Sequence, residues 1–153
     1  MVFSLTTDTA GDAAGRARMH ATCVAYRGRG VLIAGASGSG KSALALQLMA
    51  LGAALVSDDQ VILERRDAML IASAPDALRG KIEARFVGIL SAPSPCAEVA
   101  IALAVLLDIS ETDRLPPDRA TNILGCPVPL LHNVAKTYFP AAILQYLEYG
   151  RQA

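Results

Sequence analysis

Eight consecutive residues, 35–42, constrain this sequence more than any other part, because they match the pattern G-x-x-x-x-G-K-[ST] without a mismatch. The residues are Gly35, Ala36, Ser37, Gly38, Ser39, Gly40, Lys41 and Ser42. Residues 30–34 before them predict a short buried strand, and residues 43–51 after them are rich in strong helix formers. Strand, glycine loop and helix in this order place backbone N–H groups and the positive end of a helix around a phosphate. The stretch therefore predicts a phosphate-binding loop, or P-loop.

Two side chains of this motif indicate which ligand the loop takes. Lys41 is expected to reach the β- and γ-phosphates of a nucleotide, and the Ser42 hydroxyl is expected to bind Mg²⁺. We therefore expect ATP and Mg²⁺ as cofactors. The competing interpretation is a glycine-rich turn beside a surface lysine, and the flanking strand and helix argue against it.

Length and composition favour one folded domain with a substantial core. The chain has 153 residues, of which 53 % are hydrophobic and 18 % are charged. A formal net charge of zero and the absence of a long basic run give no support for nucleic-acid binding. The apolar run 101–107 is too short to span a bilayer, and the first residues lack the features of a signal peptide. Three widely separated cysteines suit reduced thiols, so we expect a cytoplasmic protein.

The remaining sequence predicts many strands and few helices. Residues 1–16 predict a loosely docked arm, and residues 17–153 predict a single P-loop domain. The expected elements, besides strand 30–34 and helix 43–51, are strands 19–26, 54–57, 61–66, 69–74 and 99–107, an extended stretch 82–90, and a helix 140–149. Residues 123–131 contain two prolines and offer at most one short edge strand. This pattern indicates an α/β domain with a strand-rich mixed sheet.

A predicted hairpin brings His20 near the loop. Strands 19–26 and 31–34 flank a turn centred near Gly28, so that paired positions have residue numbers summing to about 57. His20 then lies opposite residue 36 or 37, at the mouth of the loop. Pairing geometry alone leaves two interpretations of His20 open: it belongs to the site, or it lies on a strand face and has no role in function.

Apolar strands end in aspartates at two places in the sequence. These aspartates are candidates for the site because phosphoryl transfer to a hydroxyl needs a carboxylate beside the attacking oxygen. Asp58 and Asp59 follow strand 54–57, and Asp108 follows strand 99–107. Adjacent carboxylates repel unless a metal, a cation or solvent relieves them, so Asp58 and Asp59 can divide metal binding and proton transfer. Aspartates at strand ends also commonly cap turns. That is the competing interpretation for the pair, and the favoured one for Asp108.

A further acidic and a basic residue share one face of the extended stretch 82–90. Alternation of side chains places Glu83 and Arg85 together, with Ile82 and Ala84 on the opposite face. A polar face that carries both signs of charge is, from the residues alone, more often ordinary surface than a site.

Four stretches together resemble bacterial HPr kinase/phosphorylase, in the short form that has the catalytic domain alone. They are His20-Ala-Thr-Cys-Val, Gly30 to Ser42, Leu55-Val-Ser-Asp-Asp59 and Ile82-Glu-Ala-Arg-Phe-Val-Gly-Ile89. The resemblance implies an ATP-dependent serine kinase that phosphorylates HPr, the phosphocarrier protein of the phosphotransferase system. It also implies a P-loop fold related to phosphoenolpyruvate carboxykinase, and it admits a homo-oligomer, since the family often forms hexamers.

The resemblance assigns roles to single residues by position. His20 matches an active-site histidine, and Lys41 and Ser42 match the lysine and the metal-binding serine of the family's P-loop. Asp59 matches the carboxylate that takes the proton from the attacking serine, with Asp58 as its neighbour. Glu83 matches a second metal-binding residue, and Arg114 matches an active-site arginine.

The sequence departs from the family at two places, and the second of them concerns the reverse reaction. Phe86 follows Arg85 where the family usually has glycine, and residues 126–131 lack the arginine- and glycine-bearing loop that the family links to phosphate removal. We therefore expect weak or absent phosphorylase activity.

Two other functions stay open as alternatives. A small-molecule P-loop kinase would carry an arginine-rich lid, and no such segment is evident in this sequence. A non-catalytic nucleotide-dependent switch would not need Asp59 as a base.

Overall fold

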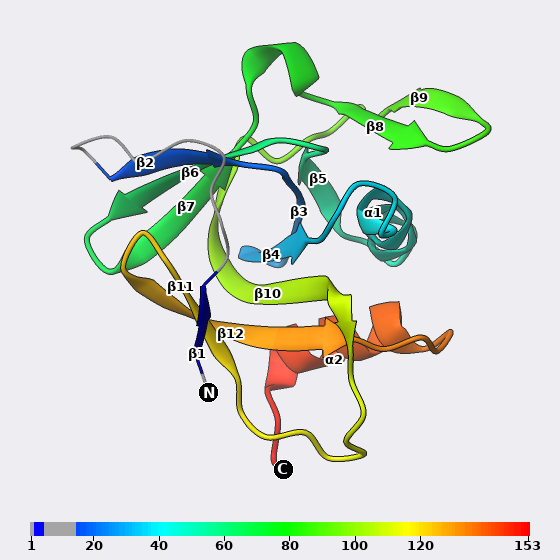
Figure 1. The fold of residues 1–153 in the computed structure, drawn as a ribbon. Helices are drawn as coiled ribbons and strands as arrows, with labels where there is room; N and C mark the ends of the chain where they lie inside the picture. The colour runs from blue at the N-terminus through cyan, green and yellow to red at the C-terminus, as the bar shows by residue number, and fades with distance from the viewer. Residues whose placement is uncertain (1, 5–14) are drawn as a thin grey trace.

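The longest strand, β10 (Glu98–Ser110), runs through the middle of the molecule (Figure 1). The structure is a computed structural model that describes residues 2–4 and 15–153. The strands of the main sheet follow the order β1 (Val2–Ser4), β11 (Ala120–Ile123), β12 (Cys126–Asn133), β10, β4 (Arg29–Ala34), β3 (Ala21–Tyr26) and β5 (Ala54–Ser57). β10 pairs in parallel with β4 and β12, whereas β3 pairs antiparallel with β4 and β5. The strand-rich mixed sheet of an α/β domain is therefore confirmed.

A second group of strands branches from the first part of β10. β7 (Met69–Ser73) pairs antiparallel with residues 98–100, and β6 (Val61–Arg66) and β2 (Arg16–Met19) continue outward from β7. β10 takes part in both groups because it is 13 residues long. Its ladder to β4 shifts register between Ile101 and Leu103, and such irregularities bend a strand.

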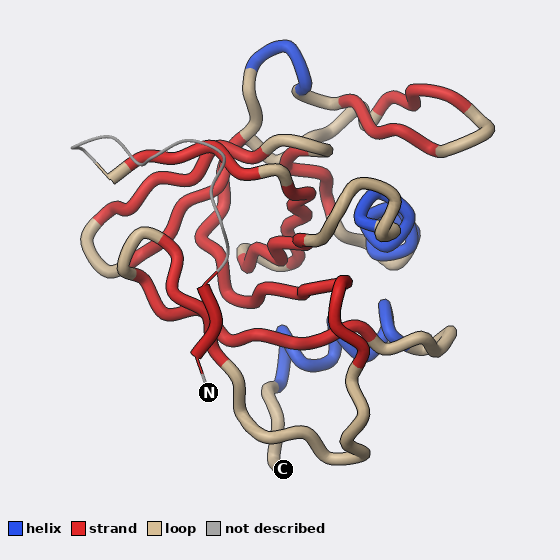
Figure 2. The backbone as a smooth tube through the Cα atoms, in the orientation of Figure 1, coloured by secondary structure: helices blue, strands red, loops and turns tan. Residues whose placement is uncertain are grey.

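The described chain has two α-helices, α1 (Lys41–Ala50) and α2 (Phe139–Tyr149), and one short 3₁₀ helix, η1 (Asp76–Leu78) (Figure 2). Both α-helices pack into one core with β4. Val31 and Ile33 of β4 belong to this core, whereas Leu32 belongs to a second core on the opposite face. Successive side chains of a strand point to opposite faces, so β4 is buried on both. The strand that leads into the loop is therefore held firmly.

The hairpin of β3 and β4 is present, but its register differs from the prediction. Arg27 and Gly28 both have positive φ, 51° and 77°, as a two-residue hairpin turn requires. Ala21 consequently pairs with Ala34, two residues short of the partner that a turn centred near Gly28 predicts. The predicted strand 19–26 is also interrupted at His20, because the residues before it form β2 and pair with β6.

The stretch 82–90 is not one extended segment, as predicted, but part of a hairpin of β8 (Lys81–Ala84) and β9 (Gly88–Ser91). The chain reverses through residues 85–87, where Phe86 has a φ of 70°. A bulky residue rarely adopts positive φ, so the sequence contains no strong signal for this turn.

The prediction of at most one short edge strand in residues 123–131 is wrong. β12 pairs with β11 along one side and, from Leu130 onward, with β10 along the other. Pro127 and Pro129 precede Leu130, so they lie where β12 has only β11 as its partner. Their missing N–H groups therefore interrupt no bond to the central strand.

The predicted N-terminal arm, residues 1–16, falls mostly outside the described residues. Its described parts are β1, which pairs in parallel with β11, and residues 15 and 16, where β2 begins. The predicted strands 54–57, 61–66, 69–74 and 99–107 and the last helix are confirmed to within about three residues, the ordinary uncertainty of element ends. Neither α-helix of the described chain has the length and apolar character that crossing a membrane needs.

Candidate active site

The loop of residues 35–42 connects the end of β4 to the start of α1, as the motif predicts. Gly38 and Gly40 have φ values of 82° and 102°, which residues with a side chain rarely adopt. Lys41 is only 6 % exposed, and its Nζ donates to the backbone oxygens of Gly35 at 2.9 Å and Ala36 at 3.1 Å. The loop therefore curls around the lysine ammonium.

Asp58, directly after β5, joins three elements around the start of α1. Its side chain is buried, and its Oδ1 accepts from Ser42 Oγ at 2.7 Å and from Thr22 Oγ1 at 2.9 Å. Its Oδ2 accepts from the backbone N–H of Glu83 at 2.9 Å. Three donors from α1, β3 and β8 thus compensate one buried carboxylate, which is the condition for keeping such a charge inside a protein. Asp58 holds the Ser42 hydroxyl and β8 in fixed positions.

Asp59 has a different environment although it is the next residue. Its φ of 72° turns the chain, and its side chain is 63 % exposed. Asp59 Oδ1 lies 3.3 Å from His20 Nδ1, and His20 Nε2 lies 3.4 Å from Lys41 Nζ. His20 therefore stands between an exposed carboxylate and the enclosed ammonium of the loop. The prediction that His20 lies at the mouth of the loop agrees with these distances.

A cavity of about 360 Å³ lies against the start of α1 and collects most of the predicted residues. The loop and α1 contribute Ser37, Gly38, Gly40, Lys41, Ser42, Ala43 and Leu46, and the opposite side consists of His20, Asp59, Glu83, Ala84 and Arg85. The cavity therefore combines backbone N–H groups, two cationic side chains and two carboxylates. That combination suits a phosphorylated ligand whose charge changes during a reaction.

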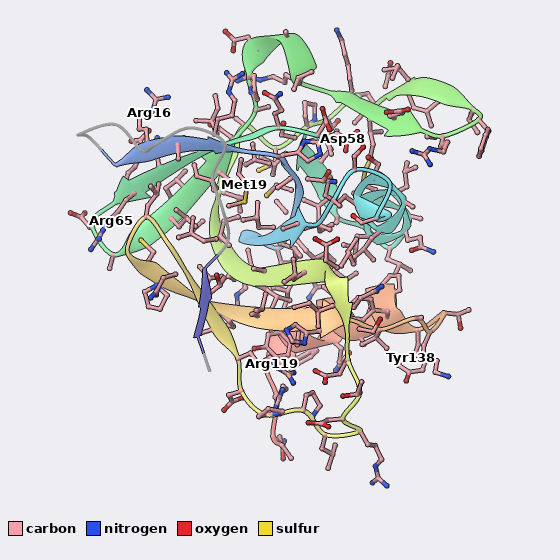
Figure 3. All side chains as sticks on the ribbon, viewed as in Figure 1. Arg16, Met19, Asp58, Arg65, Arg119 and Tyr138 are labelled. Atoms are coloured by element: carbon pink, nitrogen blue, oxygen red, sulfur yellow. The ribbon has the colours of Figure 1, made fainter. Side chains whose placement is uncertain are left out.

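Five predicted residues do not line this cavity. Gly35, Ala36 and Asp58 hydrogen-bond to Lys41 or Ser42, which do line it, and Ser39 lies between two lining glycines. The fifth is Arg114. It is exposed on the loop between β10 and β11 and is not among the described residues that line the cavity. Figure 3 shows Arg119, near the end of that loop, on the far side of β10 and β12 from Asp58.

Three further residues contribute to the site without having been predicted as part of it. Thr22 donates to Asp58 and also accepts, at 3.4 Å, from the backbone N–H of Asp59. Arg85 lines the cavity beside Glu83. Both Oδ atoms of Asp108 accept from the N–H of Ala36, at 3.0 and 3.2 Å, so this aspartate supports the loop from its outer side. The sequence contained a signal for each of them: Thr22 lies two residues after His20, Arg85 shares a face with Glu83, and Asp108 follows an apolar strand.

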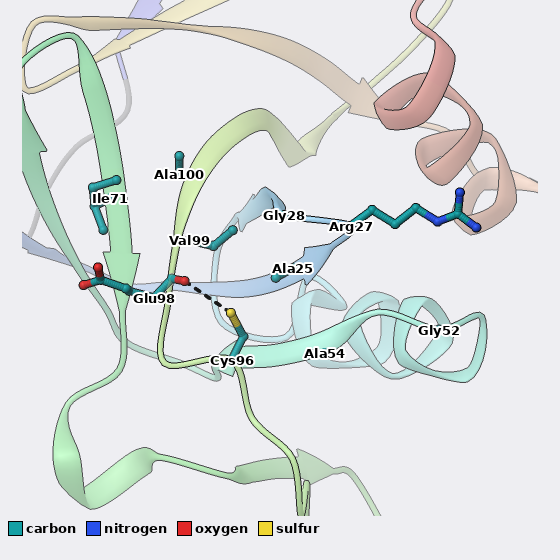
Figure 4. Close-up of a pocket in the computed structure, with 10 residues that line it drawn as sticks. All are labelled: Ala25, Arg27, Gly28, Gly52, Ala54, Ile71, Cys96, Glu98, Val99 and Ala100. Atoms are coloured by element: carbon teal, nitrogen blue, oxygen red, sulfur yellow. Dashed lines mark hydrogen bonds between the residues drawn. The ribbon is translucent and has the colours of Figure 1, made fainter.

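A larger cavity, of about 470 Å³, lies near the turn between β3 and β4 and contains none of the loop residues 35–42 (Figure 4). Its walls are mostly apolar, and its charged side chains are already engaged. Arg27 pairs with Glu148, and Glu98 accepts from Arg66 at 2.8 and 3.1 Å. The Arg66 guanidinium holds the pKa of the Glu98 carboxyl below its ordinary value. Size alone therefore does not identify the site, and the smaller cavity carries the chemistry.

Comparisons with known proteins agree on one family. Residues 12–132 match the family described as HPr Serine kinase C-terminal domain. An HPr kinase/phosphorylase from Clostridium botulinum (strain Eklund 17B / Type B) is 34 % identical over 142 residues, which are 86 % of this chain and 47 % of the relative. The HPr kinase/phosphorylase of Acidovorax sp. (strain JS42) is 38 % identical over 128 residues, 75 % of this chain and 40 % of the relative. The chain thus spans about half the length of the curated relatives that it matches.

A solved structure shows the same likeness in three dimensions. The Hpr(Ser) kinase/phosphatase from Coxiella burnetii superposes with a TM-score of 0.72 and 26 % sequence identity. The superposition covers 86 % of this chain and 88 % of that one.

Proposed function

Because the chain belongs to the HPr serine kinase family, whose C-terminal domain matches residues 12–132, we propose that it transfers the γ-phosphate of ATP to a seryl hydroxyl of HPr. The observation that carries the proposal is the cavity that joins Lys41, Ser42, Asp59 and Glu83. In this proposal residues 35–42 are a P-loop, and the domain is of the phosphoenolpyruvate carboxykinase type that the resemblance implies.

The loop and its lysine bind the nucleotide phosphates in this proposal. The loop supplies backbone N–H groups, and α1 adds the partial positive charge of its N-terminus. The Lys41 ammonium, held against the carbonyls of Gly35 and Ala36, neutralises charge on the β- and γ-phosphates.

The donor atoms beside the loop fit Mg²⁺. Ser42 Oγ and the Asp58 carboxylate are 2.7 Å apart, and Glu83 lines the same cavity, so the available donors are all oxygen atoms. No group of three or more His, Cys, Asp or Glu side chains suited to a metal occurs among residues 2–4 and 15–153. Mg²⁺ seldom needs one, because it keeps waters and substrate phosphates as ligands. When bound at Ser42 and Glu83, it would neutralise charge on the phosphate oxygens during transfer.

Asp59 takes the proton in the proposed reaction. As the seryl oxygen bonds to the γ-phosphorus, the bond from that phosphorus to the bridging oxygen breaks, and ADP leaves. The seryl proton passes to the exposed carboxylate of Asp59. His20, 3.3 Å from that carboxylate and 3.4 Å from Lys41, orients Asp59 toward the phosphate that Lys41 binds. Asp58 is engaged by three donors, so it supports the site and does not accept the proton.

We also propose that the reverse activity, removal of the seryl phosphate, is weak or absent. Its support is the region 126–131, which lies within β12 and lacks the basic, glycine-bearing sequence. Incubating seryl-phosphorylated HPr with the protein and inorganic phosphate measures this activity directly, and efficient release of HPr would contradict the proposal.

A cytoplasmic location and assembly of several copies complete the proposal. The three cysteines are free thiols, which suits a reducing compartment. Sedimentation of the purified protein measures its assembly state.

Phosphate transfer from γ-labelled ATP, measured with three kinds of acceptor, tests the function. We expect label on a seryl hydroxyl of purified HPr in the presence of Mg²⁺. Label on shikimate or a nucleoside monophosphate instead would indicate a small-molecule kinase. Nucleotide binding with no transfer to any acceptor would indicate a nucleotide-dependent switch.

A further inference from the structure

The β8–β9 hairpin exposes an unusual amount of apolar surface beside the cavity. Of the ten large hydrophobic side chains that are exposed in the described chain, four lie in residues 86–90. They are Phe86 at 100 %, Val87 at 74 %, Ile89 at 67 % and Leu90 at 36 % exposure. Single exposed apolar residues are normal on a protein surface, but a group of them indicates a binding surface.

The two faces of the hairpin have different roles. Residues that are directly opposite in an antiparallel pair share a face, so Leu90 lies beside Ile82, and Ile89 lies beside Glu83. Ile82 is buried in the core with α1, which anchors that face to the body. Glu83 lines the cavity, so the largely exposed Ile89 lies on the face that carries this cavity residue. We call the exposed side chains of Phe86, Val87 and Ile89, which follow the cavity residues 83–85 along the hairpin, the apolar strip.

The hairpin tip holds its aromatic side chain in solvent despite an unfavourable backbone. Phe86 has a φ of 70°, a conformation that bulky residues rarely adopt. Figure 1 shows β8 and β9 projecting beyond the rest of the molecule on the side of α1. The turn accounts for the positive φ, but the ring itself is left uncovered at a projecting tip, where a partner can reach it.

We infer that the apolar strip docks the polypeptide segment that carries the acceptor serine, and that this segment has apolar side chains next to the serine. The inference rests on the proposed function. Glu83, Ala84 and Arg85 line the cavity, and Phe86 follows them without interruption. A seryl hydroxyl that approaches Asp59 on a polypeptide must pass this rim, and its neighbouring side chains then meet the strip.

Other occupants of the strip agree less well with its position. A small polar acceptor lies within the cavity and gains little from an apolar surface outside it. A second copy of this chain seated on the strip would cover the rim past which the seryl hydroxyl must enter. The continuity between strip and cavity wall therefore favours a protein acceptor.

Kinetics with purified HPr test the inference. Phe86→Gly removes the ring and suits the positive φ, and Ile89→Ser removes the second apolar anchor. In the double variant we expect KM for HPr to rise at least tenfold, while kcat at saturating HPr and the affinity for ATP with Mg²⁺ change less than twofold. Leu115→Ser and Met69→Ser, at side chains 63 % and 54 % exposed elsewhere on the surface, are the controls and should leave KM unchanged.

The outcomes separate the inference from the proposed function. If the wild-type protein phosphorylates HPr and the double variant has the same KM, the inference is wrong and the function stands. Loss of an assembly in sedimentation without a change of KM would make the strip an interface between copies, which also overturns the inference. A wild-type protein that neither binds nor phosphorylates HPr overturns both.

Discussion

Asp58 and Asp59 are neighbours in sequence, yet the structure gives them opposite environments. The positive φ at Asp59 separates their side chains, so that one carboxylate is buried under three donors and the other faces the cavity beside His20. Alternation along an ideal strand also places them apart, but it cannot indicate which one the protein buries. The donors that decide this, Thr22 and Ser42, come from other elements.

Removing the charge of each aspartate should have distinct effects. Asp59→Asn should slow transfer to HPr by about 10²–10⁴-fold, the usual contribution of a general base, with nucleotide affinity changed by no more than a few-fold. Asp58→Asn should instead raise the Mg²⁺ concentration that transfer requires and lower the stability of the fold, because the amide N–H₂ group meets donors where the carboxylate accepted from them. Single-turnover rates and Mg²⁺ titrations measure both. If transfer is nearly normal in Asp59→Asn but lost in a folded Asp58→Asn variant, the two aspartates have the opposite roles.

Thr22 should act through the two aspartates without touching the substrate. Thr22→Val keeps the shape of the side chain but removes the hydroxyl that donates to Asp58 and accepts from Asp59 N–H. We expect a loss of about 1.5–3 kcal/mol of unfolding free energy, the usual range for a hydrogen bond to a charged group. Turnover should fall more than KM for ATP rises. Thr22→Ser should restore both, and a Ser variant as slow as the Val variant would show that packing alone matters.

At the scale of elements, the loop of residues 35–42 depends on close approach at its first glycine. A Cβ at Gly35 would lie 2.5 Å from Ser39 Oγ, and the φ there is 154°. Gly88 has a comparable φ of 139°, with nothing within 4 Å of an added Cβ, which makes it a matched control. Gly35→Ala should therefore weaken ATP binding at least tenfold, by calorimetric titration, whereas Gly88→Ala should not. If Gly35→Ala binds ATP no more weakly than Gly88→Ala does, the contact with Ser39 does not limit the loop.

The end of β12 should make stability depend on pH. His132 is 6 % exposed, and burial lowers the pKa of its imidazole below the ordinary 6.5. Below pH 6.5 the unfolded chain therefore binds a proton that the folded chain resists, and acidification favours unfolding. The melting temperature should fall as the pH decreases from 7.5 toward 5.5, and His132→Gln should reduce that slope. If the melting temperature of the variant changes with pH as steeply as that of the wild-type protein, His132 is not the cause of the pH dependence.

At the scale of the whole molecule, the sequence predicted the elements with strong local patterns. The glycine loop, β5 and α2 follow from residue types and spacing within a few residues. The β8–β9 turn was missed because Phe86 adopts a conformation that its residue type disfavours. β12 was missed because its prolines lie where only one side of the strand is paired.

Long-range pairing explains the parts of the site that local pattern could not predict. β10 and β4 are parallel, and Leu106 pairs with Ala34, so two residues later Asp108 reaches Ala36 of the loop. This contact joins residues 72 positions apart and depends on the order of strands in the sheet. The same limit applies to the exposed strip of the β8–β9 hairpin, which only the folded chain reveals beside the cavity.

The central claim is that the loop of residues 35–42 delivers a phosphate to a seryl hydroxyl of HPr. The most direct measurement is mass spectrometry of purified HPr after incubation with ATP, Mg²⁺ and either the wild-type protein or Lys41→Ala. We predict one added phosphate on a serine with the wild-type protein and none with the variant, which should keep the wild-type circular dichroism spectrum. HPr left unmodified by the wild-type protein, or modified equally by a folded Lys41→Ala variant, would contradict the account.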